Sequence, residues 1–315
     1  MIACATGDQA ILTAAAKGTG EVCQSLLHAV HGKGNVNTIQ DNNGDSLVHI
    51  LARQGLVEPI DDLLDLSSDS LTLQGADGRD PLAIAIKHGQ VEALKFLLTK
   101  TGEWEAETVS VSGRELSIKE LRSSPAIQLS KAELQSEHVV LIAVCITDNT
   151  RITSLDLSGN QLLGDPLNPD FTGMQTLARA IPLAENLAVV DVSSNDLGPK
   201  GASLLASAVK FSSSMKKIKV NGCELPIDVL KTEAEIDLSN KNLTPLDAVV
   251  IATCMNVNAS MTFLDLSSNA LTKGKKKEKG EKNRRYGPDE YHTDMTGIKA
   301  IADALSVSSS MNSLK

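Results

Sequence analysis

Apolar residues in the first hundred positions recur at helical spacing, in a unit that occurs three times. The units begin at Gly7, Gly44 and Gly78, and the second and third align with each other without a gap. Each unit reads as a short helix of Ala, Leu and Ile that a glycine ends, followed by a second helix with a Leu-Leu pair. Because each unit has one apolar face, we expect neighbouring units to stack and bury it.

A different pattern, L-x-L-x-x-N-x-L, begins at Leu155, Val190 and Leu264. Apolar and polar positions alternate in this pattern, as they do in a strand. An Ala/Leu-rich stretch with helical spacing follows it, for example residues 248–255. Weaker copies begin at Val109, Ile127, Ile218 and Ile236. The pattern predicts coils in which a strand alternates with a helix, and the coils that begin at Val109 and Ile218 are shorter than the others.

The second half of the chain also contains a longer duplication. Residues 109–162 align without a gap with residues 218–271, and 22 of the 54 positions are identical. Residues 173–190 align with residues 297–314 at a larger offset, so an insertion stands between positions 271 and 297. We infer that a block of several coils was duplicated.

Both patterns resemble known repeat families. Residues 46–49 (Ser-Leu-Val-His) and 80–83 (Asp-Pro-Leu-Ala) partly match the Thr-Pro-Leu-His-x-Ala turn of the ankyrin repeat, which implies structural roles for Ser46, His49 and Asp80. The L-x-L-x-x-N-x-L pattern resembles the leucine-rich repeat of the ribonuclease-inhibitor type, whose asparagine turns inward to bond the backbone. The resemblance implies an α/β solenoid, a leucine-rich-repeat horseshoe with parallel strands inside and helices outside, preceded by an all-α ankyrin-like helical array. We expect the array over residues 1–103 and the leucine-rich-repeat domain over 104–315.

Composition agrees with thin apolar layers, because only 2% of the residues are aromatic. The net charge of −9 argues against broad binding of nucleic acid or anionic membranes. The longest apolar run, residues 139–146, is far shorter than the roughly twenty residues that span a bilayer. Five widely spaced cysteines without a CxxC motif favour a reducing compartment, so we expect a cytoplasmic protein.

The residue between the two apolar positions of each strand faces the concave side of the expected solenoid. This places Asp156 and Asp191 on one side of Lys219, and Asp237 and Asp265 on the other. We expect this acidic row to bind a basic surface of a protein partner. The alternative is that LDLS is a common solvated version of the motif.

A lysine-rich insertion near residues 272–294 breaks the acidic character of the chain. Residues 273–285 hold eight Lys or Arg against two Glu, and we expect them to form a solvated loop outside the solenoid. The basic residues that we single out are Lys275, Lys276, Lys277, Lys279, Arg284 and Arg285. They suggest a nuclear-import signal or a contact with an acidic partner, and any nucleic acid is expected to bind only here.

No phosphate-binding, nucleophile-elbow or zinc-protease motif occurs, and the six histidines have no ligand spacing. We therefore expect no catalytic residues, no metal site and no cofactor. The leading hypothesis is a non-catalytic scaffold or adaptor that binds proteins through the concave face and the ankyrin-like surface. A ligand-sensing arm of a receptor-type protein, and a stoichiometric inhibitor or GTPase regulator, are the alternatives. The chain ends where another strand would open, so we expect further repeats beyond it; the oligomeric state stays open.

Overall fold

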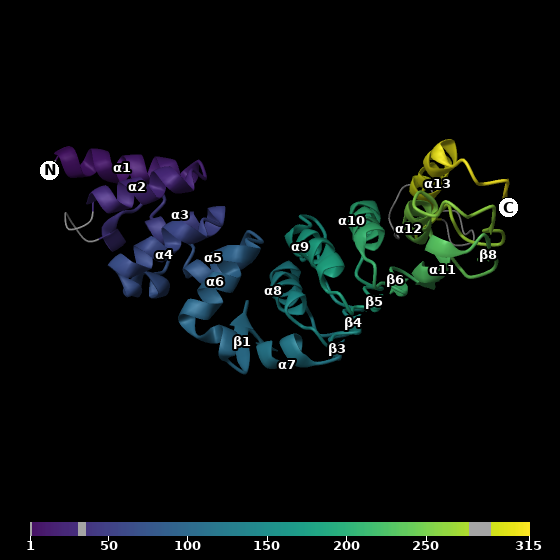
Figure 1. The fold of residues 1–315 in the computed structure, drawn as a ribbon, viewed down its shortest axis with the longest axis horizontal. Coiled ribbons are helices and arrows are strands. Elements are labelled where there is room, and N and C mark those ends of the chain that lie inside the picture. The colour runs from purple at the N-terminus through teal and green to yellow at the C-terminus, as the bar shows by residue number, and fades with distance from the viewer. Residues whose placement is uncertain (1, 31–35, 277–290) are drawn as a thin grey trace, which may run out of the picture. The chain divides into compact units, whose positions relative to one another are not determined.

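The computed structural model describes residues 2–30, 36–276 and 291–315 (Figure 1). The chain forms two compact units. The first comprises Met1–Arg122 with Glu137–Cys145, and the second comprises Ser123–Ser136 with Ile146–Lys315. The domain boundary expected between residues 103 and 104 stays a prediction.

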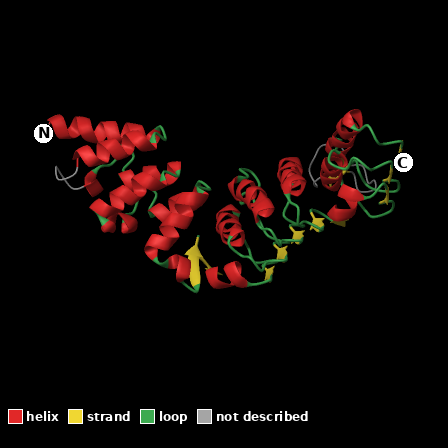
Figure 2. Cartoon of the chain, in the orientation of Figure 1, coloured by secondary structure: helices red, strands yellow, loops and turns green. Residues whose placement is uncertain are grey.

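The first unit begins with three pairs of helices (Figure 2). The pairs are α1 (Ile2–Ala16) with α2 (Gly20–Val30), α3 (Leu47–Gln54) with α4 (Val57–Leu66), and α5 (Pro81–Lys87) with α6 (Val91–Thr101). Short 3-10 helices η1 (Val36–Thr38), η2 (Ser68–Thr72) and η3 (Glu103–Glu105) follow the pairs. The first helices of successive pairs pack on one another, and so do the second helices. Leu51, Leu63 and Leu97 are buried between them, which confirms the expected stacking.

The glycines that end the first helices do so by their backbone conformation. Gly55 follows α3 at φ +75° and Gly89 follows α5 at φ +64°, in the left-handed region that residues with a Cβ avoid. The Gly55 N–H donates to the carbonyl of Ala52, which satisfies one of the last acceptors of the helix.

The turn residues of the ankyrin-like motif have the expected structural roles. Ser46 Oγ lies 2.6 Å from Nδ1 of His49, a fully buried ring whose Nε2 lies 3.1 Å from the carbonyl oxygens of Leu73 and of Arg79. Because carbonyls only accept, Nε2 carries the proton and Nδ1 accepts from the serine hydroxyl. Asp80 accepts from the N–H of Ala83 and caps α5. The predicted structural roles of Ser46, His49 and Asp80 are confirmed.

The first unit continues in a β-hairpin of β1 (Thr108–Val111) and β2 (Arg114–Ser117), followed by α7 (Ile118–Ser123). The prediction that Val109 opens a strand of the parallel ladder is therefore wrong: Val109 pairs antiparallel with Leu116. Ser112 (φ 48°) and Gly113 (φ 81°) are both left-handed, the conformation that a two-residue hairpin turn requires. This short coil has room for the hairpin and for a helix of only 6 residues. Helix α8 (Ser136–Thr147) is divided between the two units.

Two sheets of the second unit are built mainly of parallel strands. The first has the order β3 (Ala126–Gln128), β4 (Ser154–Asp156), β5 (Val189–Asp191), β6 (Lys217–Lys219) and β7 (Glu224–Pro226), all parallel neighbours except β7, which is antiparallel to β6. The second consists of three parallel strands, β8 (Glu235–Asp237), β9 (Phe263–Asp265) and β12 (Ser313–Leu314), with β9 in the middle. Strands that are far apart in sequence are therefore direct neighbours, as in a solenoid.

Helices connect these strands and lie on one side of them, as Figure 1 shows for α9 and α10 above β4–β6. Those that lie wholly in the second unit are α9 (Thr172–Ala180) with the 3-10 helix η4 (Ile181–Leu183), α10 (Gly198–Phe211), α11 (Ile227–Thr232), α12 (Pro245–Met255) and α13 (Thr296–Val307). Helix α10 packs on α9 and α12, and α12 packs on α13. Leu155, Val190 and Leu264 point into the layer between strands and helices and are at most 1% exposed. The expected solenoid of parallel strands and helices is confirmed.

The duplication is visible in the fold. The hairpin β6–β7 and the short helix α11 repeat the plan of β1, β2 and α7: Val109 pairs with Leu116 in the first hairpin, and Ile218 pairs with Leu225 in the second. The second hairpin also separates β6 from β8. A single uninterrupted ladder of parallel strands, as the sequence suggested, does not form.

The lysine-rich insertion begins and ends in a pair of strands. β10 (Lys273–Lys276) pairs antiparallel with β11 (Tyr291–Thr293). Of the basic residues singled out, Lys275 and Lys276 lie on β10. Lys277, Lys279, Arg284 and Arg285 lie outside the described residues.

Candidate protein-interaction surface

Asparagines follow three of the parallel strands in the second unit, β4, β5 and β9. The amide oxygen of Asn160 accepts from the N–H groups of Ala132 (2.8 Å) and Leu134 (3.0 Å) in the preceding coil, and its nitrogen donates to the carbonyls of Leu129 and Leu157, both at 2.8 Å. Asn195 and Asn269 make corresponding bonds. The predicted inward turn of these side chains is confirmed. These bonds fix the backbone at the ends of the strands.

The last residue of each parallel strand from β3 to β9, and Lys315 directly after β12, face away from the helices, and together these residues form the strand face. It comprises Gln128, Asp156, Asp191 and Lys219 in the first sheet and Asp237, Asp265 and Lys315 in the second. Their neighbours in the strands, such as Leu155 and Ile236, are buried on the opposite side.

In the first sheet the strand face reads Gln128, Asp156, Asp191, Lys219 across adjacent strands. Asp191 lies between a carboxylate and an ammonium group, and its Oδ2 is 3.4 Å from Nζ of Lys219. The lysine therefore neutralises one of the two adjacent carboxylates.

In the second sheet Asp237 lies opposite Asp265. Lys315 follows β12 and bonds the backbone of β9 on both sides of Asp265, and its Nζ is 3.1 Å from Oδ2 of that aspartate. The order Asp, Asp, Lys thus occurs in both sheets. The sequence-based interpretation missed Lys315, although the alignment of residues 297–314 with 173–190 already placed a strand there.

The expected single row with Lys219 at its centre is corrected by the sheet order. On its other side Lys219 faces Glu224 of the antiparallel strand β7, not Asp237. The structure thus brings Asp156, Asp191 and Lys219 together and places Asp237 and Asp265 in a separate sheet.

The aspartates of the strand face also fold the turn that follows each strand. Oδ1 of Asp156, Asp191, Asp237 and Asp265 accepts the backbone N–H two residues later, at 2.8–2.9 Å. The hydroxyl and N–H of Ser239 lower the pKa of Asp237; those of Ser267, followed by Lys315, lower the pKa of Asp265. Both carboxylates therefore stay charged throughout the neutral range. Oδ2 of Asp265 pairs with Lys315, as Oδ2 of Asp191 pairs with Lys219.

Among residues 2–30, 36–276 and 291–315, no group of three or more His, Cys, Asp or Glu side chains is arranged to hold a metal ion. In the same residues no helix is long and apolar enough to cross a membrane. Cys23, Cys145, Cys223 and Cys254 form no disulfide bond, and of these four only Cys223 is not buried.

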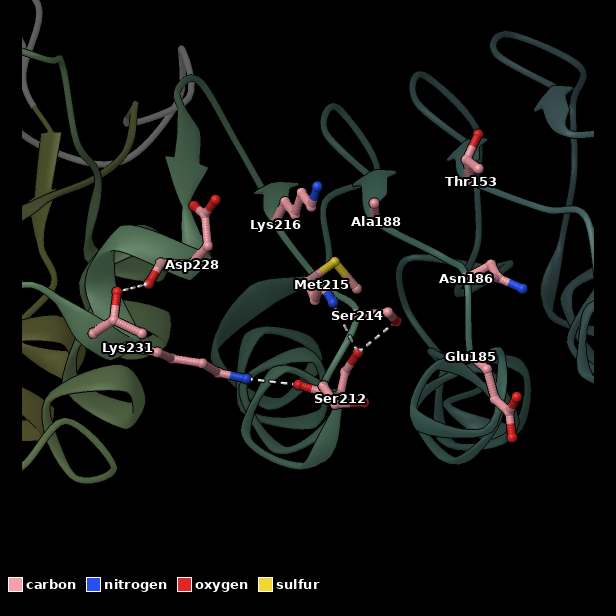
Figure 3. A pocket seen from close by; sticks show the side chains of 12 residues that line it. Thr153, Glu185, Asn186, Ala188, Ser212, Ser214, Met215, Lys216, Asp228 and Lys231 are labelled. Atoms are coloured by element: carbon pink, nitrogen blue, oxygen red, sulfur yellow. Dashed lines mark hydrogen bonds between the residues drawn. The ribbon is translucent and has the colours of Figure 1, made fainter.

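A hollow of about 550 Å³ lies at the other end of the strands in the second unit (Figure 3). Thr153, Ala188 and Lys216, which directly precede β4, β5 and β6, form one wall, and residues of α11 form another. The loop after α10, including Met215, lies between them in Figure 3. The sequence contained no signal for this feature.

Comparisons with known proteins match both repeat regions. A family model described as ankyrin repeats (3 copies) matches residues 5–108. One described as leucine-rich repeat matches residues 148–166 and 185–206. Synphilin-1 of Mus musculus is 34% identical over 68 residues, which are 21% of this chain and 7% of that protein. The chain therefore aligns with a small fraction of the length of this relative.

These matches coincide with the helix pairs of the first unit and with the strand, asparagine turn and helix of the second. Both families are typically non-catalytic modules that bind proteins. The chain carries an N-terminal array of ankyrin repeats followed by leucine-rich repeats, and it is a repeat protein of the kind that mediates protein interaction.

Proposed function

We propose that the chain is a non-catalytic scaffold or adaptor whose strand face binds a basic surface of a protein partner. One observation carries the proposal. In each sheet one carboxylate is neutralised by a lysine, whereas Asp156 and Asp237 have no Lys or Arg within ion-pair distance among the described residues. Each sheet therefore offers one negative charge for a cation from outside.

Adjacent carboxylates make a basic partner preferable to a neutral one. At the spacing of paired strands, about 5 Å, two carboxylates repel by about 1 kcal/mol in water and by about 3 kcal/mol at an effective dielectric constant of 20. A neutral partner that excluded water would increase this repulsion between Asp156 and Asp191, and between Asp237 and Asp265. Lysine or arginine side chains of a partner would relieve it.

The test is quantitative capture of the native partner from the source cell by the full chain and by Asp156→Asn with Asp237→Asn. Asparagine keeps the oxygen that accepts the turn N–H, so the variant removes charge and not the turn. We expect about a tenfold loss of affinity or more, because two ion pairs of a binding surface are removed. The matched control is Asp165→Asn with Asp303→Asn, which removes the same charge from an exposed loop and from α13, outside both the strand face and the hollow.

Equal losses in the two double variants would assign the effect to net charge and contradict a role for the strand face. Unchanged capture by Asp156→Asn with Asp237→Asn would also contradict it. A third variant, which lacks residues 273–285, tests separately whether the lysine-rich insertion contributes to binding of the native partner.

The helix pairs of the first unit are proposed as a second binding surface, and the lysine-rich insertion as a nuclear-import signal or a contact for an acidic partner. A cytoplasmic location is proposed as well. The four described cysteines, none in a disulfide bond, are consistent with a reducing compartment.

A further inference from the structure

The short helix α11 leaves space beside its neighbours. Helix α10 has 14 residues and α12 has 11, and they pack on each other, whereas α11, between them in the chain, has six. The hollow of about 550 Å³ opens next to α11, within the roughly 300–1,000 Å³ of typical ligand clefts.

The hollow combines an apolar floor with polar rims. Met215 is 3% exposed, and in Figure 3 its side chain lies in the middle of the lining residues. Lys231 reaches in from α11, and its ammonium group donates to the carbonyls of Val209 (2.5 Å) and Ser212 (2.8 Å). Two carboxylates, those of Glu185 and Asp228, belong to the lining.

The first copy of the duplicated block has an aromatic residue at a sequence position that corresponds to the lining of the hollow. When the alignment of residues 109–162 with 218–271 is continued toward the N-terminus, Ser213 of the hollow corresponds to Trp104, and Lys231 corresponds to Arg122. The guanidinium group of Arg122 lies over the Trp104 ring, 4.2 Å from its centroid, and also donates to the Trp104 carbonyl at 2.8 Å. The first copy therefore supplies its own indole ring, and the second copy has a serine and a hollow instead.

We propose that the hollow in the second copy is a docking site for an indole side chain of a protein partner, which takes the place that Trp104 has in the first copy. The sulfur of Met215 and the methyl group of Ala188 suit contact with an aromatic ring. An indole N–H is a donor only, and the carboxylates of Glu185 and Asp228 and the serine hydroxyls of the loop are acceptors. The site lies at the amino ends of the strands and is separate from the strand face.

The test is NMR of the full chain with methyl-labelled methionine. The Met215 methyl signal is identified as the one that is absent in Met215→Leu. N-acetyl-tryptophanamide is the probe, and N-acetyl-leucinamide is the control probe. We expect the tryptophan probe to shift the Met215 methyl signal in a saturable way, with a dissociation constant on the order of 1 mM, as suits a single side chain. The leucine probe should bind at least about fivefold more weakly, because it lacks the ring and the donor.

Two matched tryptophan substitutions separate filling of the hollow from the mere presence of another ring. Ser213→Trp restores the arrangement of the first copy, so it should abolish binding of the probe. Ser207→Trp places the ring on the exposed face of α10, away from the lining, and should leave binding unchanged. Lys231→Arg should strengthen binding about two- to fivefold, because a guanidinium group stacks on an indole as Arg122 does.

Three results would overturn the proposal: no saturable shift of the Met215 signal, an equal shift with the leucine probe, or undiminished binding to folded Ser213→Trp. The variant Asp156→Asn with Asp237→Asn should bind the probe normally. If this variant loses the native partner but still binds the probe, the loss concerns the strand face. If a variant loses the probe but still binds the native partner, the loss concerns the hollow.

Discussion

The two copies of the duplicated block, residues 109–162 and 218–271, agree at several buried positions and differ at several exposed ones. Asn160 and Asn269 each bond two N–H groups of the preceding coil, and Cys145 and Cys254 are both fully buried. By contrast Gln128 corresponds to Asp237 on the strand face. Packing and hydrogen bonding limit which residue can occupy a buried position, whereas an exposed position tolerates a change of residue more readily. The exposed differences are therefore where the recognition properties of each copy are expected.

The largest effect is expected from the paired core leucines. Leu155→Ala and Leu264→Ala each remove a side chain that is at most 1% exposed, and each should lower the free energy of unfolding by about 3–5 kcal/mol. Urea unfolding of both variants checks this. A difference of more than about 2 kcal/mol between them would show that the two copies do not pack equivalently.

A somewhat smaller loss is expected from the asparagines. Asn160→Ala and Asn269→Ala leave two backbone N–H groups and two carbonyls without their partner, which should cost about 2–3 kcal/mol in either copy. Asn168→Ala, in an exposed loop, is the control and should change the free energy of unfolding by less than about 0.5 kcal/mol. A loss confined to one copy would refute the equivalence of the two turns.

Cysteine alkylation compares a position that the copies share with one that they do not. Burial raises the pKa of Cys254 to about 12, and Cys145 is equally buried in the first copy. Cys223, where the first copy has Arg114, is half-buried. Iodoacetamide near pH 8 should modify Cys223 at least about tenfold faster than either buried thiol, measured residue by residue by mass spectrometry. Equal rates would mean that helix α12 opens readily.

The smallest effect concerns Asp247, which stands where the first copy has His138. Asp247 forms a capping box with Thr244 at the start of α12, and burial raises the pKa of its carboxyl group. Because the pKa of this carboxyl group is higher in the folded than in the unfolded protein, its ionisation destabilises the fold. The stability that the protonated group provides is therefore lost as the pH rises through the folded pKa. Asparagine cannot ionise. The stability of Asp247→Asn relative to wild type should therefore increase between about pH 3 and about pH 7, in thermal unfolding at both values.

A relative stability of Asp247→Asn that stays constant, or that falls with rising pH, would contradict this account of Asp247.

Much of the fold could be predicted because its signals are local. The L-x-L-x-x-N-x-L pattern identified the strands at Leu155, Val190 and Leu264, since alternation and the inward asparagine are properties of one coil. The hairpins were missed, although Ser112-Gly113 and Asn221-Gly222 are dipeptides that favour tight turns. Val109 and Val111 alternate as any strand does, and only the pairing with Leu116 reveals an antiparallel partner.

The candidate site was predicted residue by residue but not in its arrangement. Alternation correctly identified Asp156, Asp191, Asp237 and Asp265 as outward positions of their strands. Whether neighbouring coils continue one sheet depends on long-range pairing, which a single sequence does not display, so the break at β7 and the ion pair of Lys315 with Asp265 were missed. The hollow beside α11 was missed for a related reason, since it arises from the short length of one helix relative to its neighbours.

The most direct test of the proposed recognition is the salt dependence of the affinity for the captured native partner, measured between about 50 and 300 mM salt. Wild type should lose affinity steeply as salt increases, and Asp156→Asn with Asp237→Asn should start weaker and show a shallower dependence. An affinity that salt does not change, or the same slope in both proteins, would contradict binding of a basic partner by the strand face.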